Sequence, residues 1–126
     1  GMARDYLERA MPVVMRRKHL LDGVPLGERP AVQALLRELP DRLEAARSAF
    51  YLRLDAAWQQ VEAGALVPED DCAQLQAVSL ALVAAARDAV DRLVPLCGLQ
   101  GADARSDLNR AWRDFHTATQ HGLFVP

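Results

Sequence analysis

A long stripe of apolar residues between positions 31 and 63 constrains the fold of this chain more than any other feature. The stripe consists of Val32, Leu35, Leu36, Leu39, Leu43, Ala46, Phe50, Leu54, Ala57 and Val61. Steps of three and four residues are the spacing of one helix face. Pro40 interrupts the stripe without changing its phase, so we predict one long helix with a kink at the proline. At about 1.5 Å per residue it would extend roughly 45–50 Å.

The same period predicts three further helices. A second long helix begins at Pro68 and ends near Gly98, with the stripe Leu75, Val78, Leu82, Ala86, Ala89, Leu93 and Cys97. Shorter helices are predicted over residues 3–18, with a bend at Pro12, and over residues 106–122. No segment alternates as a strand does. The sequence therefore predicts an all-α fold, an antiparallel four-helix bundle with two long and two shorter helices in one domain over residues 1–126.

Charge and hydropathy argue against two classes of partner. The formal net charge of −2 gives no electrostatic reason to expect nucleic acid. The basic run at residues 16–18 is interpreted as a solvated helix end. No apolar stretch approaches the ~20 residues that cross a bilayer, and no signal segment opens the chain. We expect a cytoplasmic protein with no nucleic acid and no membrane as partner.

The two cysteines also bear on the cellular setting. Cys72 and Cys97 are predicted on one helix, about 37 Å apart at 1.5 Å per residue, which is too far for a disulfide. We interpret both as small buried apolar residues of a cytosolic protein. Gly1, ahead of Met2, is interpreted as the remnant of a removed tag.

The last predicted helix has two ordered faces. One carries Leu108, Trp112, Phe115 and Thr119, and the other carries Arg110, Asp114, Thr117 and His121. A helix with an apolar face and an ordered polar face can make contacts on both sides, so we expect functional residues on this helix. Two simpler interpretations stay open. Arg110 and Asp114 are spaced for a surface ion pair, and His121 is placed to interact with the C-terminal dipole, with Gly122 ending the helix.

Several kinds of site have no support in the sequence. A di-iron centre in a four-helix bundle needs two Glu-x-x-His pairs, and the chain contains none. His116 and His121 diverge by roughly 140° around a helix and cannot share a metal ion. Zinc spacing, a phosphate-binding glycine loop and a serine–histidine arrangement are absent as well.

Three motifs together resemble the acyl-CoA dehydrogenase superfamily. The segment GVPLGERPAVQALL at residues 23–36 places Gly23, Pro25 and Gln33 at the spacings that open the long first helix of that family's C-terminal domain. CGLQG at residues 97–101 resembles the family's glycine-rich turn, and RAWRD at residues 110–114 resembles its arginine–aspartate signature. The resemblance covers nearly the whole chain. It implies that Gln33, Arg113 and Asp114 bind the cofactor, with the orientation of a subunit interface as the alternative role for Arg113 and Asp114.

The residues after this signature resemble one branch of the superfamily. Fatty-acyl dehydrogenases continue with a glutamate-glycine-threonine segment that carries the catalytic base, whereas this chain reads TATQHG. The pattern is similar to the flavin-dependent monooxygenases, in which a histidine at this point lies near the flavin and substrate. The resemblance therefore implies that His121 is catalytic, exchanging a proton near neutral pH, with FAD or FMN as the cofactor of the complete enzyme.

One departure from the family concerns the loop before the long helix. His19 and Asp22 stand where dehydrogenases carry an arginine and a phenylalanine that reach the flavin of a neighbouring subunit. An aspartate there would repel a pyrophosphate. We therefore expect no tight binding of FAD in the dehydrogenase mode, and the use of reduced FMN or FAD as a loosely held substrate stays open. We expect no flavin to be bound by this chain alone.

The resemblance implies a longer enzyme. A complete member has an N-terminal helical domain and a middle β-domain, so this chain would supply oligomer contacts and one wall of the flavin pocket and would be inactive alone. The alternative is a stand-alone helical assembly or binding module that kept the fold and lost the chemistry. Both predict a homodimer or tetramer, because the two long helices carry more apolar surface than the two short ones can cover.

Overall fold

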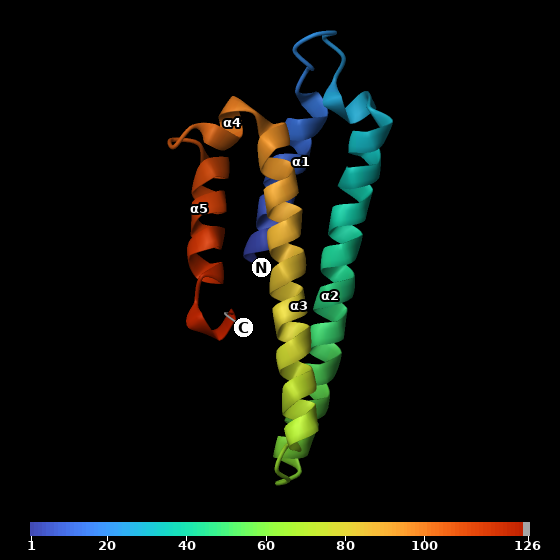
Figure 1. Ribbon diagram of the computed structural model, residues 1–126, viewed down its shortest axis with the longest axis vertical. Coiled ribbons are helices and arrows are strands. Elements are labelled where there is room, and N and C mark those ends of the chain that lie inside the picture. Colours follow the sequence, from blue (N-terminus) through green and yellow to red (C-terminus); the bar gives the residue numbers. More distant parts are fainter. Residues whose placement is uncertain (125–126) are drawn as a thin grey trace.

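The computed structural model describes residues 1–124, and over this range the chain is helical and contains no strand. Two long helices, α2 (Pro30–Glu62) and α3 (Glu69–Leu93), form an antiparallel hairpin. Two shorter helices, α1 (Met2–Arg16) and α5 (Asp107–Thr119), pack beside one end of it, which is the upper end in Figure 1. The predicted all-α bundle with two long and two shorter helices is confirmed. A short helix α4 (Leu99–Ala102) precedes α5.

The core lies at the upper end of the hairpin, where the four longer helices meet. Tyr6, Ala10 and Val14 of α1 are completely buried. Against them lie buried residues of the other helices, namely Leu36 and Leu39 from α2, Ala89, Val90 and Leu93 from α3, and Leu108 and Phe115 from α5. We call residues 30–46 and 82–93 the upper half of the hairpin and residues 47–81 the lower half. None of the described helices has both the length and the apolar character needed to cross a membrane.

Helix α2 continues through Pro40 without a break, as the unbroken phase of its apolar stripe predicts. Its stripe is buried mainly in the upper half. Val32, Leu36 and Leu39 are buried there, whereas in the lower half Ala57 is the one buried member and Val61 is exposed. The reason is that α1 and α5 are too short to cover the lower half of the hairpin, as Figure 1 shows.

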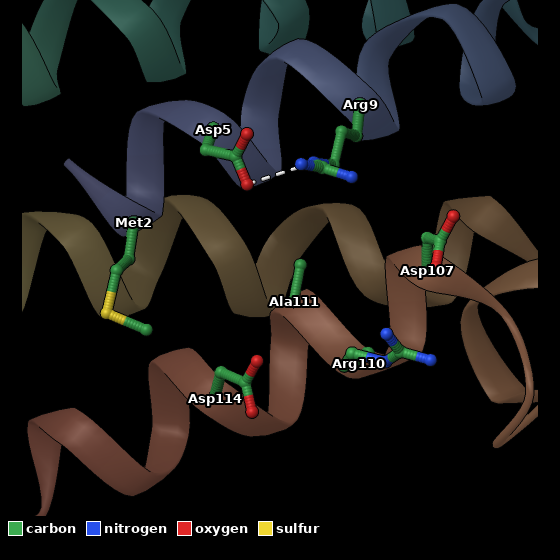
Figure 2. A pocket seen from close by; sticks show the side chains of 7 residues that line it. All are labelled: Met2, Asp5, Arg9, Asp107, Arg110, Ala111 and Asp114. Atoms are coloured by element: carbon green, nitrogen blue, oxygen red, sulfur yellow. Dashed lines mark hydrogen bonds and ion pairs between the residues drawn. The ribbon is translucent and has the colours of Figure 1, made fainter.

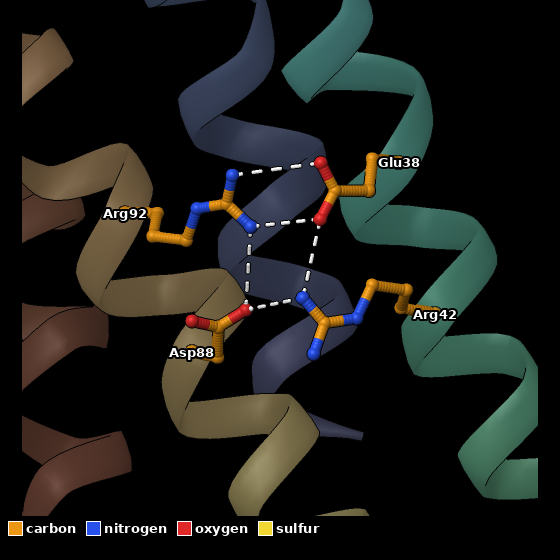
Figure 3. Close-up of polar contacts among 4 residues, drawn as sticks. All are labelled: Glu38, Arg42, Asp88 and Arg92. Carbon is orange, nitrogen blue, oxygen red and sulfur yellow. Dashed lines mark hydrogen bonds and ion pairs between the residues drawn. The ribbon is translucent and has the colours of Figure 1, made fainter.

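An ionic network joins α2 to α3 in the upper half (Figure 3). Arg92 donates to Glu38 over 2.9 Å, and Arg42 donates to both Glu38 and Asp88 at 3.1 and 3.0 Å. The bond from Arg92, followed by that from Arg42, holds the pKa of the Glu38 carboxyl below its ordinary value. The network fixes the long helices in register just outside the core.

The glycine-rich turn after α3 is closed by the side chain of Arg17, the residue that follows α1. Pro95 ends the regular helix and a short 3-10 segment, η2 (Val94–Cys97), follows. The guanidinium of Arg17 donates to the carbonyls of Pro95 and Leu96 at 3.1 and 3.0 Å. Gly98 has a φ of +60°, and a Cβ atom there would lie 2.7 Å from Cζ of Arg17. Glycine is therefore required at this point of the CGLQG motif.

Helix α5 is shorter than predicted. It begins after Ser106, whose hydroxyl accepts the amide of Asn109 at 3.0 Å, but it ends at Thr119 instead of Gly122. Arg87 of α3 donates to the carbonyl of Thr119 and thereby binds the C-terminal end of the helix. A 3-10 turn, η3 (Gly122–Phe124), follows. His121 therefore lies in a turn and not on the polar face of the helix, and Gly122 is not the helix-ending residue.

The cysteines differ in their surroundings. Cys97 is buried, and burial raises the pKa of its thiol. Cys72 is exposed in the first turn of α3, so the prediction that both are buried is wrong for this residue. The lower tip of the hairpin has no second layer of helices to cover it. Both cysteines are free thiols.

Candidate functional site

A groove lies where α1 begins and the lower half of the hairpin loses its cover. Its volume is about 940 Å³, close to the upper end of the range typical of small-molecule sites. All four longer helices contribute to its walls, together with Phe124 of η3. The principal apolar and aromatic side chains are Met11, Phe50, Tyr51, Leu82, Phe115 and Phe124. Arg4, Glu8, Glu44 and Arg47 supply charged groups.

His121 lies beside this groove. Its ring meets that of Phe124 edge-on, with 6.3 Å between centroids, and Phe124 lines the groove. The Nδ1 atom accepts the backbone amide of Leu123 at 3.2 Å. Among the described residues no group bonds Nε2, so this is the nitrogen through which the imidazole can exchange a proton. The residue is exposed.

Asp114 lies in a different, polar pocket between α1 and α5 (Figure 2). The pocket has a volume of about 230 Å³ and is lined by Met2, Asp5, Arg9, Asp107, Arg110, Ala111 and Asp114. Asp5 and Arg9 are joined across one turn of α1 at 2.9 Å. Arg110 and Asp114 form no ion pair in the described part of the chain, so the surface pair permitted by their spacing is not made. The pocket brings charged side chains of both signs together from two helices.

Arg113 is held by the turn before α5. Its guanidinium donates to the carbonyl of Ala104 at 3.3 Å. In the same turn, Arg105 donates to Asp103, and this bond together with the Arg105 amide holds the pKa of the Asp103 carboxyl below its ordinary value. The Arg113 guanidinium therefore bonds the backbone just before α5 begins, whereas His121 lies beyond the other end of this helix.

Gln33 is held in a similar way at the start of α2. Its amide nitrogen donates to the carbonyl of Gly27 at 2.9 Å. Gly27 approaches the end of α1 so closely that a Cβ atom would lie 2.9 Å from the carbonyl oxygen of Met15. The bond from Gln33 thus helps to hold the loop between α1 and α2 against α1, and the amide oxygen of Gln33 remains able to accept a hydrogen bond.

The loop that carries His19 and Asp22 is ordered by its own contacts. Lys18 and Pro25 form an antiparallel bridge across it. The Asp22 carboxylate accepts the amide of Val24 at 3.0 Å and is paired with Arg29, and these contacts, the amide first, lower the pKa of its carboxyl. Asp22 is therefore ionised, with Arg29 offsetting part of its charge.

The structure does not bring the four predicted site residues into one place. Gln33 lies at the upper end of α2, whereas Arg113, Asp114 and His121 lie on α5 and the turn after it, with α1 and α3 between the two groups (Figure 1). The described residues contain no cluster of three His, Cys, Asp or Glu placed to hold a metal ion. A flavin enclosed by this chain alone would therefore not contact all four residues.

The groove itself was not predicted from the sequence. Phe50 and Phe115 belong to the apolar stripes and were assigned to the interior, but in three dimensions they also line the groove. Tyr51 and Phe124 belong to neither stripe and gave no signal. The predicted lengths of the helices indicated that part of the apolar surface of the hairpin is uncovered, but they did not indicate that a groove forms at this point.

Comparison with known proteins gives a match to one family and similarity to two individual relatives. The family model for the acyl-CoA dehydrogenase C-terminal domain matches residues 1–126. The pigment production hydroxylase of Rhodococcus erythropolis is 30% identical over 104 residues, which are 82% of this chain and 26% of that protein. The indole-3-acetate monooxygenase of Pseudomonas putida is 29% identical over 123 residues, 98% of this chain and 32% of that protein. The chain thus spans between a quarter and a third of the length of these curated relatives.

Proposed function

This chain belongs to the acyl-CoA dehydrogenase family as a C-terminal domain, and from this premise we propose that it is the C-terminal helical domain of a flavin-dependent monooxygenase. It supplies oligomer contacts and one wall of a pocket for flavin and substrate. The observation that carries the proposal is the groove with His121 at its edge, in a chain whose relatives include a hydroxylase and a monooxygenase. The rest of the pocket is assigned to the N-terminal and middle domains of a longer protein.

The groove fits part of a flavin. The rings of Phe50, Tyr51, Phe115 and Phe124 offer flat apolar surface of the kind that packs on a planar ring system. Arg4 and Arg47 are cations suited to a phosphate group. Reduced FAD or FMN, when bound, supplies the electrons that activate molecular oxygen. We assign this cofactor to the complete enzyme and expect the isolated chain to bind none.

Within this proposal His121 is the catalytic residue. Its Nε2 holds or releases a proton beside the pocket, while the bond from the Leu123 amide to Nδ1 fixes which nitrogen does so. Arg113, Asp114 and Gln33 are assigned to cofactor binding. Because they lie apart in one chain, they would act on surfaces shared with the other domains or with another copy. A cytoplasmic location is also proposed, since both cysteines are free thiols.

The proposal is tested first on the isolated chain. Titration with FMN and FAD, each oxidised and reduced, should show no saturable binding at micromolar concentration, and no oxygen should be consumed. Micromolar binding or turnover would contradict the proposal that this domain is inactive alone.

The role of His121 is tested in the protein encoded by the complete reading frame. Changing His121→Asn should lower kcat for hydroxylation by about 10²–10⁴-fold, while flavin binding and subunit mass stay as in the parent protein. The loss should be accompanied by disappearance of one limb of the pH profile of kcat. An unchanged kcat would exclude His121 as the proton-transfer group.

A second candidate function is a helical assembly module that has lost flavin chemistry. It is favoured by the contacts of Gln33 and Arg113, both of which donate to backbone carbonyls and are explained by the fold without a cofactor. The reading frame ahead of Met2 separates the two candidates. Intact flavin-binding domains encoded there would rule out the assembly module.

A further inference from the structure

One face of α3 carries two charged side chains that contact the last turn of α5. Arg87 donates to the backbone carbonyl of Thr119, and Asp91 bonds Nε2 of His116 at 2.9 Å. Arg87 and Asp91 are four residues apart, a spacing that permits an ion pair between them. In the described chain they make no such pair, and each reaches across to α5 instead. We call Arg87 and Asp91 the α5 clamp.

The clamp is separate from the contacts that α3 makes with α2. Asp88 and Arg92 follow the two clamp residues by one position each, and both belong to the ionic network with α2 (Figure 3). One residue turns an α-helix by about 100°, so the two pairs lie on different faces of α3. Arg92 is therefore an arginine of the same helix that bonds a different neighbour, which makes it a matched control.

Arg87 takes the place of a backbone donor that a longer helix would supply. In an α-helix the carbonyl of one residue accepts the amide four residues further on, so a continued α5 would bond Leu123 to Thr119. Thr119 is the last residue of α5 and is 8% exposed, so water has little access to it. The Arg87 guanidinium bonds this carbonyl, where a cation is also favoured by the helix dipole. The helix can therefore end here without leaving the acceptor unpaired.

The end of the helix determines the setting of His121. In the observed turn the Leu123 amide donates to Nδ1 of His121 at 3.2 Å. A neutral imidazole that accepts at Nδ1 carries its proton on Nε2. The same turn brings Phe124 to the groove wall beside His121. The contact that Arg87 makes at the helix end thus has a consequence at the imidazole.

We propose that Arg87 is a positioning residue for His121. By binding the carbonyl of Thr119 it ends α5, and the turn that follows presents the Leu123 amide to Nδ1. Nε2 is then the nitrogen that carries the exchangeable proton. This inference rests on the proposed function, in which His121 transfers a proton, and it names the residue that fixes the tautomer.

The surroundings of Arg87 support this assignment. The described chain gives Arg87 no carboxylate partner, although the residue is partly buried. A cation withdrawn from water needs polar groups to replace the water. The C-terminal end of α5 supplies such a group in the carbonyl of Thr119. The contact with α5 therefore accounts for where this side chain lies.

Asp91 holds the same part of α5 from a second point. The His116 ring that it bonds lies against Trp112 and Phe115, with ring centroids 4.8 and 5.4 Å apart. Phe115 also lines the groove. The contact with Asp91 therefore secures the part of α5 that carries the groove wall, while the other clamp residue holds the helix end.

The tautomer of His121 tests the proposal in the isolated chain. Long-range proton–nitrogen NMR spectra at about pH 8.5, where an ordinary imidazole is neutral, report which ring nitrogen carries the proton. His121→Asn identifies the signal. The parent chain should show His121 protonated on Nε2 alone, whereas Arg87→Met, which removes the guanidinium, should give a mixture of both tautomers. A folded Arg87→Met chain with the Nε2 tautomer alone overturns the proposal.

Two variants control for loss of charge and for loss of an α3 arginine. Arg87→Lys keeps a cationic donor and should retain the Nε2 tautomer. Arg92→Met removes the arginine that bonds α2 and should retain it as well, and a mixture there would overturn the proposal. Amide hydrogen exchange in the parent chain needs no variant. The Leu123 amide should exchange at least about 10-fold more slowly than an unbonded amide, and an unprotected amide would contradict the inferred turn.

Kinetics of the protein encoded by the complete reading frame test whether Arg87 acts through His121. Arg87→Met should lower kcat for hydroxylation by about 10–100-fold with KM unchanged, and Arg87→Lys should restore most of the loss. In a His121→Asn background the same change should have no further effect. Losses that multiply in the double variant would show that Arg87 acts independently of His121 and would overturn the proposal.

The outcomes separate this inference from the proposed function. A kcat that His121→Asn leaves unchanged overturns the proposed catalytic role, whereas the tautomer in the isolated chain still decides whether Arg87 sets the imidazole. If His121→Asn lowers kcat but Arg87→Met leaves both the tautomer and kcat as in the parent, the inference fails and the proposed function stands.

Discussion

The upper and lower halves of the α2–α3 hairpin consist of the same two helices and the same apolar period, yet they differ in burial. In the upper half, Leu39, Val90 and Leu93 are almost or entirely inaccessible to solvent. In the lower half, residues 47–81, only Ala57 is buried. The difference arises from α1 and α5, which cover one half and end before the other. A helical period therefore identifies which face is apolar, but the neighbouring helices decide whether that face becomes core, groove or interface.

The largest expected effect comes from removing a leucine in each half. Leu39→Ala in the upper half, where the residue is 1% exposed, should lower the free energy of unfolding by about 3 kcal/mol through lost burial and a cavity. Leu52→Ala in the lower half, where the residue is 72% exposed, should change it by less than about 0.5 kcal/mol. Urea unfolding followed by circular dichroism measures both. Equal losses would contradict the division into a packed and an open half.

A smaller effect is expected from a glycine at each end of the hairpin. Gly98 and Gly64 both have positive φ, but only Gly98 has atoms close to where a Cβ would lie. Gly64→Ala should cost about 1 kcal/mol for the backbone conformation alone. Gly98→Ala should cost about 2–3 kcal/mol, since Arg17 must also move. If the two alanine variants unfold at the same urea concentration, the contact with Arg17 adds nothing to the cost of replacing Gly98.

The ionic network lies in the upper half only, and it should make the stability of the chain depend on pH. The pKa of Glu38 is lowered in the folded chain by Arg92 and then Arg42, so the network stabilises the fold at pH values above the ordinary pKa of this carboxyl. This contribution is lost as the pH falls through the folded pKa. Glu38→Gln should therefore reduce the decline in thermal stability below about pH 4.5. Arg92→Gln should do the same, and a decline as steep as in the parent would argue against the network.

The least perturbing test compares the two thiols. Cys72, exposed at the lower tip, should react rapidly with a thiol reagent in the native chain. Cys97, buried just after the upper end of α3 and with a raised pKa, should not. One thiol per chain should therefore react at neutral pH before unfolding and two after. A Cys72→Ser chain should show no fast reaction. Rapid modification of Cys97 in that variant would show that the upper half opens readily.

Much of the fold followed from local pattern. The phase of the stripe across Pro40 predicted a continuous α2, and the start of the last helix at Ser106 agrees with its observed cap. The end of that helix could not be predicted, because Arg87 of another helix binds the carbonyl of Thr119. His121 consequently lies in a turn, a position that no local rule gives. The roles of His121, Gln33, Arg113 and Asp114 stay predictions.

The resemblance to the family is confirmed, and the contacts of two of the motif residues come from distant parts of the chain. Gly98 in the CGLQG segment has a positive φ that requires glycine and lies against the guanidinium of Arg17, and Gln33 is held by the loop that contains Gly27. A sequence motif records that a residue type is needed at a position. It does not record which neighbour imposes the need.

The amino-acid sequence by itself determined that this chain is helical, that two helices are long, and that it belongs with the acyl-CoA dehydrogenase C-terminal domains. These properties depend on spacing along the chain, which is a local quantity. The tertiary structure alone decided which half of the hairpin is covered, where a groove remains, and how far His121 lies from Gln33. Those properties depend on how separate helices contact one another, and no interval along the sequence encodes such contacts.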